Sequence, residues 1–182
     1  FAWSHGMKNT PITKGELFNK YFYKIVDKVL LYGDFSKNVM LSEGFRPNQL
    51  VPIYNSLDHS AHIEIRKSLS KNSVFQAYFK NDYPVIIYIG RIQKSKKLDL
   101  LVRSVRKLLD KNIKCNLVFV GADIENSEIF ELVDELGLNK NVWKYGPCYD
   151  EVEIGNLFFN ASLCVSPGPV GLTALHALTF GC

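Results

Sequence analysis

Residues 85–110 read Val85-Ile-Ile-Tyr-Ile-Gly-Arg-Ile-Gln-Lys-Ser-Lys-Lys-Leu-Asp-Leu-Leu-Val-Arg-Ser-Val-Arg-Lys-Leu-Leu-Asp110, and this stretch decides the fold. It begins with an apolar run that has the length of a buried strand. After a glycine and a basic loop, apolar residues recur at offsets of 0, 3, 4, 7, 10 and 11, which follow one helical face: Leu98, Leu101, Val102, Val105, Leu108 and Leu109. The stretch therefore predicts a strand over 84–89 that leads into an amphipathic helix.

The same alternation of strand and helix continues beyond this stretch. A strand over 116–120 precedes a helix that Gly137 closes, and a short strand over 141–144 precedes a helix near 150–159. A last strand over 162–165 leads into a helix over 171–180. Strands and helices that alternate through short loops are typical of a parallel sheet with helices on both faces. The predicted fold class is therefore α/β, with a doubly wound sheet.

A shorter alternation of helices and strands is predicted for the first 54 residues. We expect a helix with one apolar face, made of Leu17, Phe18, Tyr21, Phe22, Ile25 and Val26. A strand over 28–32 follows, then a helix that Asp34 or Ser36 can cap and Gly44 closes. In the next strand, over 49–54, Pro52 predicts an edge or a strand end. We interpret residues 55 to about 80 as an interdomain connection with some helix.

The composition of the 182-residue chain excludes several classes of protein. It is 47% hydrophobic and 22% charged, as globular domains are, which excludes disorder, collagen and disulfide-rich miniproteins. No apolar run approaches the ~18 residues of a membrane span. The net charge of +4 favours anionic ligands or membrane surfaces. The chain begins with Phe1 and stops just after a helical pattern, so we expect a piece of a longer protein.

The four cysteines contain no C-x-x-C pair, which argues against a zinc or thioredoxin-like site. Cys115 and Cys164 stand beside apolar strand residues and are interpreted as small buried hydrophobes, so a reducing compartment fits best. His59 and His62 have H-x-x-H spacing, but no third metal ligand is evident near them in the sequence.

A basic loop follows the first strand of the main alternation. It runs Gly90-Arg-Ile-Gln-Lys-Ser-Lys-Lys97, directly ahead of a helix N-terminus. Ligands of open α/β sheets gather at the carboxyl ends of the strands, and helix N-termini attract anions. Arg91 and Lys96 are therefore candidates for holding a phosphate or diphosphate. The alternative is a solvated basic loop.

Three further segments fall at strand ends. Gly121 lets backbone approach a ligand, although α/β turns commonly carry such a glycine. Residues 165–176 form a Pro/Gly-rich loop that leads into a helix. The amides of Gly171, Leu172 and Thr173 at its N-terminus can bind phosphate. His176, about one turn later, could reach a sugar or ribose hydroxyl. The alternative is an ordinary strand-to-helix turn. His5 follows an N-terminal strand as a general base, a hydrogen-bond donor or simply a loop residue.

Neither G-x-G-x-x-G nor G-x-x-x-x-G-K-[ST] occurs in the sequence, which counts against nicotinamide dehydrogenases and P-loop enzymes.

Together these segments resemble glycosyltransferase family 4 (glycosyl transferases group 1), retaining sugar transferases of the GT-B fold and of the bacterial polysaccharide type. The resemblance covers nearly the whole chain, and the order and spacing of its pieces make it specific. From residue 85 on, the pieces are Tyr88-Ile-Gly-Arg91, Lys96, Leu98-Asp-Leu-Leu101, Leu117-Val-Phe-Val-Gly121, Leu136-Gly-Leu138, Asn141-Val-Trp-Lys-Tyr-Gly146, Ser166-Pro167 and Gly171-Leu172 through to Gly181. Before it, Trp3-Ser-His-Gly6 resembles the loop of the active-site histidine, and Asn55-Ser-Leu-Asp58 the Asn-Gly-Val-Asp signature.

The resemblance implies two Rossmann-like doubly wound domains, both incomplete in this chain. Residues 1–60 would be the C-terminal half of the N-terminal, acceptor-side domain. Residues 61–80 would be the interdomain connection. Residues 81–182 would be the nucleotide-sugar-binding domain, truncated at its end.

The resemblance also implies roles for single residues. Arg91 and Lys96 would hold the donor diphosphate and neutralise the charge on the leaving group, and His5 would approach the donor sugar, so these three are the catalytic candidates. Backbone around Tyr145 and Gly146 would meet the nucleotide base. The full set of substrate-binding candidates is Gly90, Gly121, Tyr145, Gly146, Gly168, Gly171, Leu172, Thr173 and His176. No metal or cofactor is expected, because the cations and a helix dipole would stabilise the negative charge on the leaving nucleotide diphosphate.

One departure stands out. The family places Glu, seven residues, then Glu in the last loop and helix, where this sequence has Gly168 and His176. His176 can still hydrogen-bond a ribose hydroxyl. Gly168 cannot replace a carboxylate, although its N–H could contact the sugar. The departure marks either a subfamily with its own donor contacts or a weaker case for catalysis.

The resemblance predicts a hexosyltransferase-like enzyme (EC 2.4) that moves a sugar from a nucleotide-diphosphate sugar to a saccharide or lipid-linked acceptor. We expect polysaccharide or glycolipid synthesis in the cytoplasm, at the cytoplasmic face of a membrane, with no nucleic-acid partner. Basic helix residues (Lys14, Lys20, Lys24 and Lys28) could touch anionic lipid as a peripheral contact, or form a solvated face. The alternatives are an epimerase on the same scaffold and a non-catalytic nucleotide-sugar-binding module.

Overall fold

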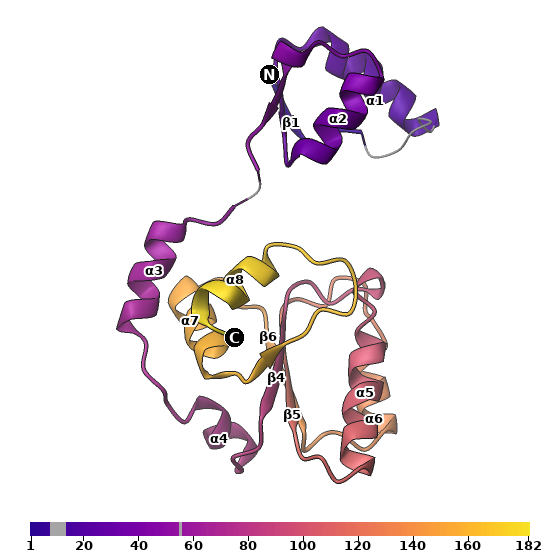
Figure 1. Cartoon of the computed structure of the whole chain (residues 1–182). Coiled ribbons are helices and arrows are strands. Elements are labelled where there is room, and N and C mark those ends of the chain that lie inside the picture. The colour runs from indigo at the N-terminus through magenta and orange to yellow at the C-terminus, as the bar shows by residue number, and fades with distance from the viewer. Residues whose placement is uncertain (8–13, 55) are drawn as a thin grey trace. The chain divides into compact units, whose positions relative to one another are not determined.

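The computed structural model describes residues 1–7, 14–54 and 56–182, which form two compact units, Phe1–Ser56 and Leu57–Cys182 (Figure 1). Each unit is described by itself. Asn55 of the predicted signature and the side chain of Lys14 lie outside the described residues. Among the helices that the structure describes, none combines the length and the apolar character needed to cross a bilayer.

Unit 1 is a parallel three-stranded sheet with two helices. Its elements are β1 (Ala2–Ser4), α1 (Lys14–Ile25), β2 (Val29–Leu31), α2 (Asp34–Ser42), a 3-10 turn (Pro47–Gln49) and β3 (Leu50–Pro52). The strand order within the described residues is β1-β2-β3, so β3 is an edge strand that ends on Pro52, as the sequence predicts.

The apolar face predicted for α1 is wrong for all of its residues except Val26, which follows the helix and packs against the core of unit 1. Phe18 and Ile25 are 78% and 81% exposed, and Leu17, Tyr21 and Phe22 are also exposed, whereas Tyr23 is buried. Polar contacts set this rotation of the helix: the Tyr23 hydroxyl hydrogen-bonds the Ser4 hydroxyl, and the buried amide of Gln49 donates to the carbonyls of Tyr23 and Val26, at 2.7 Å each. The Gln49 amide thereby satisfies carbonyls that the end of a helix leaves unpaired.

The predicted cap of α2 is also wrong, while its predicted end is confirmed. Gly33 is the N-cap, and no side chain caps the helix. The Asp34 carboxylate instead accepts from the Tyr54 hydroxyl, and the Ser36 hydroxyl donates to the carbonyl of His5. After α2, Gly44 has φ +83°, a left-handed conformation that favours glycine and ends the helix.

Unit 2 is a doubly wound α/β sheet, as predicted. Its strands are β4 (Val85–Ile89), β5 (Asn116–Val120), β6 (Val142–Gly146) and β7 (Leu163–Cys164), all parallel in the order β6-β5-β4-β7. Its helices are α3 (His59–Ser68), α4 (Val74–Phe79), α5 (Leu98–Asp110), α6 (Ile129–Glu135), α7 (Glu151–Asn160) and α8 (Thr173–Phe180), with a 3-10 turn over Lys94–Lys96.

Two apolar layers hold this sheet between its helices. The predicted face of α5 packs with α6 on one side, with Val102 and Val105 fully buried. Helices α3, α4, α7 and α8 cover the other side, where Phe158 and Phe180 are fully buried (Figure 1). Part of the segment interpreted as an interdomain connection is thus the helix α3, which packs against α7 and α8 within unit 2.

The cysteines are all free thiols. Cys115 is buried as predicted, whereas Cys164 is only partly buried.

Candidate functional site

The glycines after β4 and β5 bring three strand ends of unit 2 together. The amide of Gly90 donates to the carbonyl of Val120 at 2.9 Å, and the amide of Gly121 donates to the carbonyl of Gly146 at 2.8 Å. At Gly121, φ is +150°, and a Cβ would lie 1.9 Å from the carbonyl oxygen of Gly90. A side chain cannot be accommodated there, so Gly121 permits the close approach of two loops at the carboxyl edge of the sheet.

Tyr88, in strand β4, holds the backbone of the basic loop through a hydrogen bond. The buried Tyr88 hydroxyl donates to the carbonyl of Arg91 at 2.8 Å, and burial raises the pKa of Tyr88 to about 12. The Arg91 side chain is exposed. This arrangement holds the backbone of Arg91 in place and leaves its guanidinium open to an anion.

Lys96 joins the basic loop to the loop before α8. Its ammonium group donates to the carbonyl of Pro169 at 2.6 Å. An ammonium group has three N–H donors, so two remain for a ligand. The two loops that the sequence predicts for phosphate binding are therefore in direct contact.

Gly168 lies at this loop contact. A Cβ at position 168 would lie 2.5 Å from the carbonyl oxygen of Ser95 and 2.7 Å from the Cα of Lys96. Both are backbone atoms, which cannot move without shifting the basic loop. A side chain at this position, where the resemblance implies Glu, would therefore require the basic loop to shift.

The start of α8 faces the end of β4. The Thr173 hydroxyl donates to the carbonyl of Ile89 at 2.9 Å, which ties the first residue of the helix to the strand. The first amides of a helix have no intrahelical acceptor and carry its positive dipole end. Leu172 is the N-cap of α8 and Thr173 its first residue, so their amides are among these, whereas Gly171 precedes the cap.

Tyr145 and Gly146 lie at the end of β6. The Tyr145 hydroxyl donates to the Glu153 carboxylate, and burial together with this carboxylate raises the pKa of Tyr145. Gly146 has φ +95° and gives its carbonyl to Gly121. These two positions are linked by backbone to the glycine after β5, and so to the same edge of the sheet.

His176 lies in a histidine–glutamate cluster that the sequence analysis missed. Its Nε2 lies 3.2 Å from Oε2 of Glu151, and its ring centroid lies 5.1 Å from that of His62. Burial lowers the pKa of His176, against the opposing influence of the Glu151 carboxylate. The H-x-x-H spacing in α3 was the only signal for this cluster, and it indicated His59 as the partner of His62.

His5 belongs to unit 1, where it follows β1. Its ring lies 4.4 Å from the ring of Tyr32, its carbonyl accepts from Ser36, and its side chain is exposed. Gly6 makes the turn after it with φ +67°, and a Cβ there would lie 2.7 Å from the side chain of Leu31.

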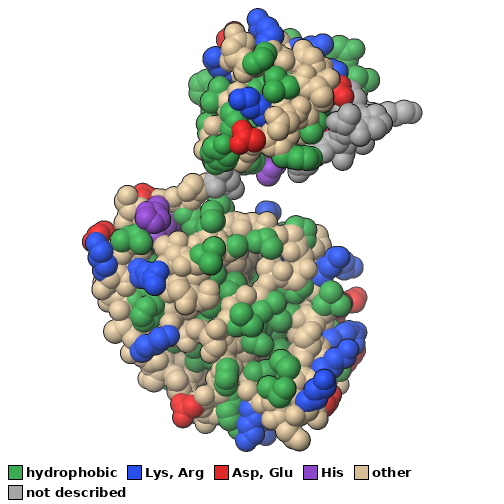
Figure 2. All heavy atoms as spheres, viewed as in Figure 1, with side chains coloured by type: hydrophobic (Ala, Val, Ile, Leu, Met, Phe, Trp, Pro, Cys, Tyr) green, Lys and Arg blue, Asp and Glu red, His purple; other side chains and the backbone are tan. Residues whose placement is uncertain are grey.

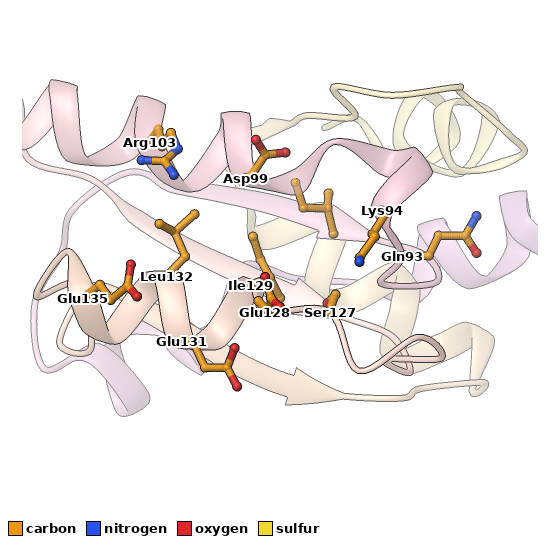
Figure 3. Close-up of a pocket in the computed structure, with 11 residues that line it drawn as sticks. Gln93, Lys94, Asp99, Arg103, Ser127, Glu128, Ile129, Glu131, Leu132 and Glu135 are labelled. Atoms are coloured by element: carbon orange, nitrogen blue, oxygen red, sulfur yellow. The ribbon is translucent and has the colours of Figure 1, made fainter.

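Two hollows of unit 2 adjoin these loops, the first through Gln93 and Lys94 of the basic loop and the second through Thr173 at the start of α8. One, of about 370 Å³, separates α5 from α6; the carboxylates of Glu128, Glu131 and Glu135 contribute to its lining, and none of the predicted site residues do (Figure 3). The other, of about 290 Å³, lies between β7 and α8 and is lined mainly by apolar side chains. Figure 2 shows hydrophobic side chains in the middle of this face of unit 2 and most of its Lys and Arg side chains around the periphery.

Comparison with known proteins identifies the family of the chain and its fold. Residues 70–182 match the family model of the glycosyl transferases group 1. An uncharacterized glycosyltransferase of Methanocaldococcus jannaschii is 27% identical over 131 residues, which are 70% of this chain and 31% of that protein.

Solved structures share the fold. A glycosyltransferase of Rickettsia africae superposes with a TM-score of 0.72 at 21% identity, over 98% of this chain and 48% of its own. HepE of Anabaena, solved in complex with UDP, superposes with a TM-score of 0.68 at 17% identity. The superposition covers 98% of this chain and 50% of HepE. This chain thus spans about half the length of these structures, and its fold is GT-B. The chain belongs to the glycosyl transferases group 1 family.

Proposed function

We propose that this protein transfers a sugar, with retention of configuration, from a nucleotide-diphosphate sugar to a saccharide or lipid-linked acceptor. The observation that carries the proposal is the contact between Lys96 and Pro169, which places the basic loop against the loop that opens α8. Family membership and a neighbour solved with UDP support a nucleotide donor.

In the proposed reaction, the bond between the anomeric carbon and the diphosphate oxygen breaks. Its electron pair goes to the departing nucleotide diphosphate. The acceptor oxygen forms the new bond to the anomeric carbon, and its proton passes to the departing diphosphate. Arg91, the two unused donors of Lys96 and the amides at the start of α8 would stabilise the negative charge that builds on the leaving group. Such a cluster supplies the charge in this step without a metal ion.

The remaining roles are extensions of this proposal. His5 would approach the donor sugar, backbone at Tyr145 and Gly146 would meet the base, and His176 would reach the ribose. We place the reaction in polysaccharide or glycolipid synthesis, in the cytoplasm, at the face of a membrane. The missing carboxylate at position 168 favours, as the second candidate, a module that binds the nucleotide sugar without turnover.

The test measures binding and turnover with a panel of UDP-, GDP- and ADP-sugars. Arg91→Ala and Lys96→Ala should each weaken binding of one nucleotide class by about 10-fold or more, since hydrogen bonds to charged groups contribute about 1.5–3 kcal/mol. Lys107→Ala is the matched control, because Lys107 is an exposed cation in the last turn of α5, at the opposite end from the basic loop.

Each outcome has a distinct meaning. Binding that both variants lose, together with product on an added acceptor, supports the transferase. Conversion of the donor without an acceptor would indicate the epimerase, and binding without turnover the module. Parent-like binding by both variants would refute the proposed diphosphate site.

A further inference from the structure

Three side chains from three helices meet on the helical face of unit 2 that carries α3, α7 and α8. Nε2 of His62 in α3 lies 2.9 Å from Oε2 of Glu151, the first residue of α7. Nε2 of His176 in α8 lies 3.2 Å from the same oxygen. One ligand atom from each residue lies within 4.8 Å of the other two. The residues are far apart in sequence, so only the packing of the three helices brings them together.

Hydrogen bonding alone does not satisfy this cluster. His62 and His176 have side chains only 6% and 15% exposed. His62 makes a hydrogen bond to Glu151, whereas the buried Nε2 of His176 lies 3.2 Å from the same carboxylate oxygen and has no recorded hydrogen bond. A buried polar atom without a hydrogen-bond partner destabilises the folded protein. The unpaired nitrogen lies beside the Glu151 oxygen, so a ligand at this point would satisfy it.

The donor set and its spacing fit a transition-metal ion. Two imidazole nitrogens and one carboxylate oxygen are a common set for Zn²⁺, whereas Ca²⁺ and Mg²⁺ prefer oxygen ligands throughout. With bonds of about 2.0–2.1 Å, tetrahedral zinc ligands lie roughly 3.3 Å apart. The two nitrogen–oxygen distances, 2.9 and 3.2 Å, are close to that spacing. Glu151 is 47% exposed, which gives an ion a route in and leaves room for water as the fourth ligand.

We propose that His62, Glu151 and His176 form a binding site for one divalent transition-metal ion. Zn²⁺ is the ion that fits the site best, and it links α3 to α7 and α8. The ion is a structural link within unit 2. It would occupy Nε2 of His176, so only Nδ1 of that ring remains for the ribose contact proposed above. Metal binding is measured without nucleotide, so its outcome is independent of the donor experiment above.

The experiment titrates Zn²⁺ into chelator-treated protein by competition with a chromogenic chelator, and repeats the titration with Co²⁺. We expect one ion per chain, a rise in Tm on adding Zn²⁺, and visible Co²⁺ bands of a four-coordinate site without a thiolate charge-transfer band. Glu151→Gln keeps the size of the side chain at an exposed position and should bind at least about 10-fold more weakly, without the rise in Tm. His176→Ala should do the same.

His59→Ala is the matched control. His59 is an exposed histidine on the same helix, outside the cluster, and its loss should leave the affinity for Zn²⁺ unchanged. Parent-like affinity in Glu151→Gln and His176→Ala would overturn the proposal. So would a thiolate band with Co²⁺, which would place the ion on the free cysteines, or the absence of saturable binding near one ion per chain.

Discussion

Gly168 departs from the family pattern at a position that has no room for a side chain. A Cβ there would meet backbone atoms of Ser95 and Lys96. We therefore predict that Gly168→Glu, which restores the family residue, destabilises unit 2 by about 2 kcal/mol or more, because overpacking against backbone has no cheap relief. Urea unfolding measures the loss. Gly171→Ala is the control for stability, since nothing lies within 4 Å of its added Cβ, and it should change stability by less than about 0.5 kcal/mol. Undiminished stability together with tighter donor binding in Gly168→Glu would contradict the packing argument.

Tyr88 gives a pH-dependent prediction at the same scale. Because burial raises its pKa from 10.0 to about 12, the folded protein keeps this phenol protonated where the unfolded chain ionises it. Stability should therefore be lost as the pH rises from 10 towards 12. Tyr88→Phe should lower the free energy of unfolding by about 1 kcal/mol at pH 8, because the hydrogen bond to the carbonyl of Arg91 is lost. The free energy of unfolding of this variant should also decrease less steeply as the pH rises above 10. Urea unfolding of parent and variant at pH 8 and pH 11 compares the two slopes; identical slopes would mean that Tyr88 is not the titrating group.

At the scale of the element, Gln49 determines how α1 is oriented. Its buried amide donates to two carbonyls at the end of that helix, at 2.7 Å each. Gln49→Ala leaves both without this partner, and we predict a loss of about 1–3 kcal/mol and faster hydrogen exchange in the last turn of α1. Asn48→Ala, at the exposed neighbouring position, should change neither. If amide hydrogen exchange in the last turn of α1 stays slow in Gln49→Ala, the packing of Tyr23 alone is sufficient to orient the helix.

The elements also show where sequence patterns succeed. The six apolar residues of α5 recur on one face and pack as predicted, because a long amphipathic helix has one favourable orientation against a sheet. In α1, the same kind of pattern predicts the wrong face. There the contacts of Tyr23 with Ser4 and Gln49, from residues distant in the chain, outweigh the burial of scattered aromatic side chains.

At the scale of the whole molecule, the two units have separate cores. Each contains one tryptophan, Trp3 in unit 1 and Trp143 in unit 2, where Trp143 stacks on Tyr78 at 4.1 Å. We predict that Trp3→Phe, which leaves Trp143 as the only tryptophan, shows a fluorescence transition at higher urea than the first loss of far-UV circular dichroism. Unit 1 is small and should unfold first. Coincident transitions would contradict this and indicate one cooperative unit.

Sequence patterns predict the α/β alternation, the family, and the loops where phosphate is expected. These features depend on local periodicity and on short motifs at strand ends, which neighbouring residues carry. The folded structure was needed to establish which face of α1 is buried, that position 168 has no room for a side chain, and that His62 meets Glu151 and His176 instead of His59. Each of these depends on contacts between residues distant in the chain, and the spacing of neighbouring residues contains no record of such contacts.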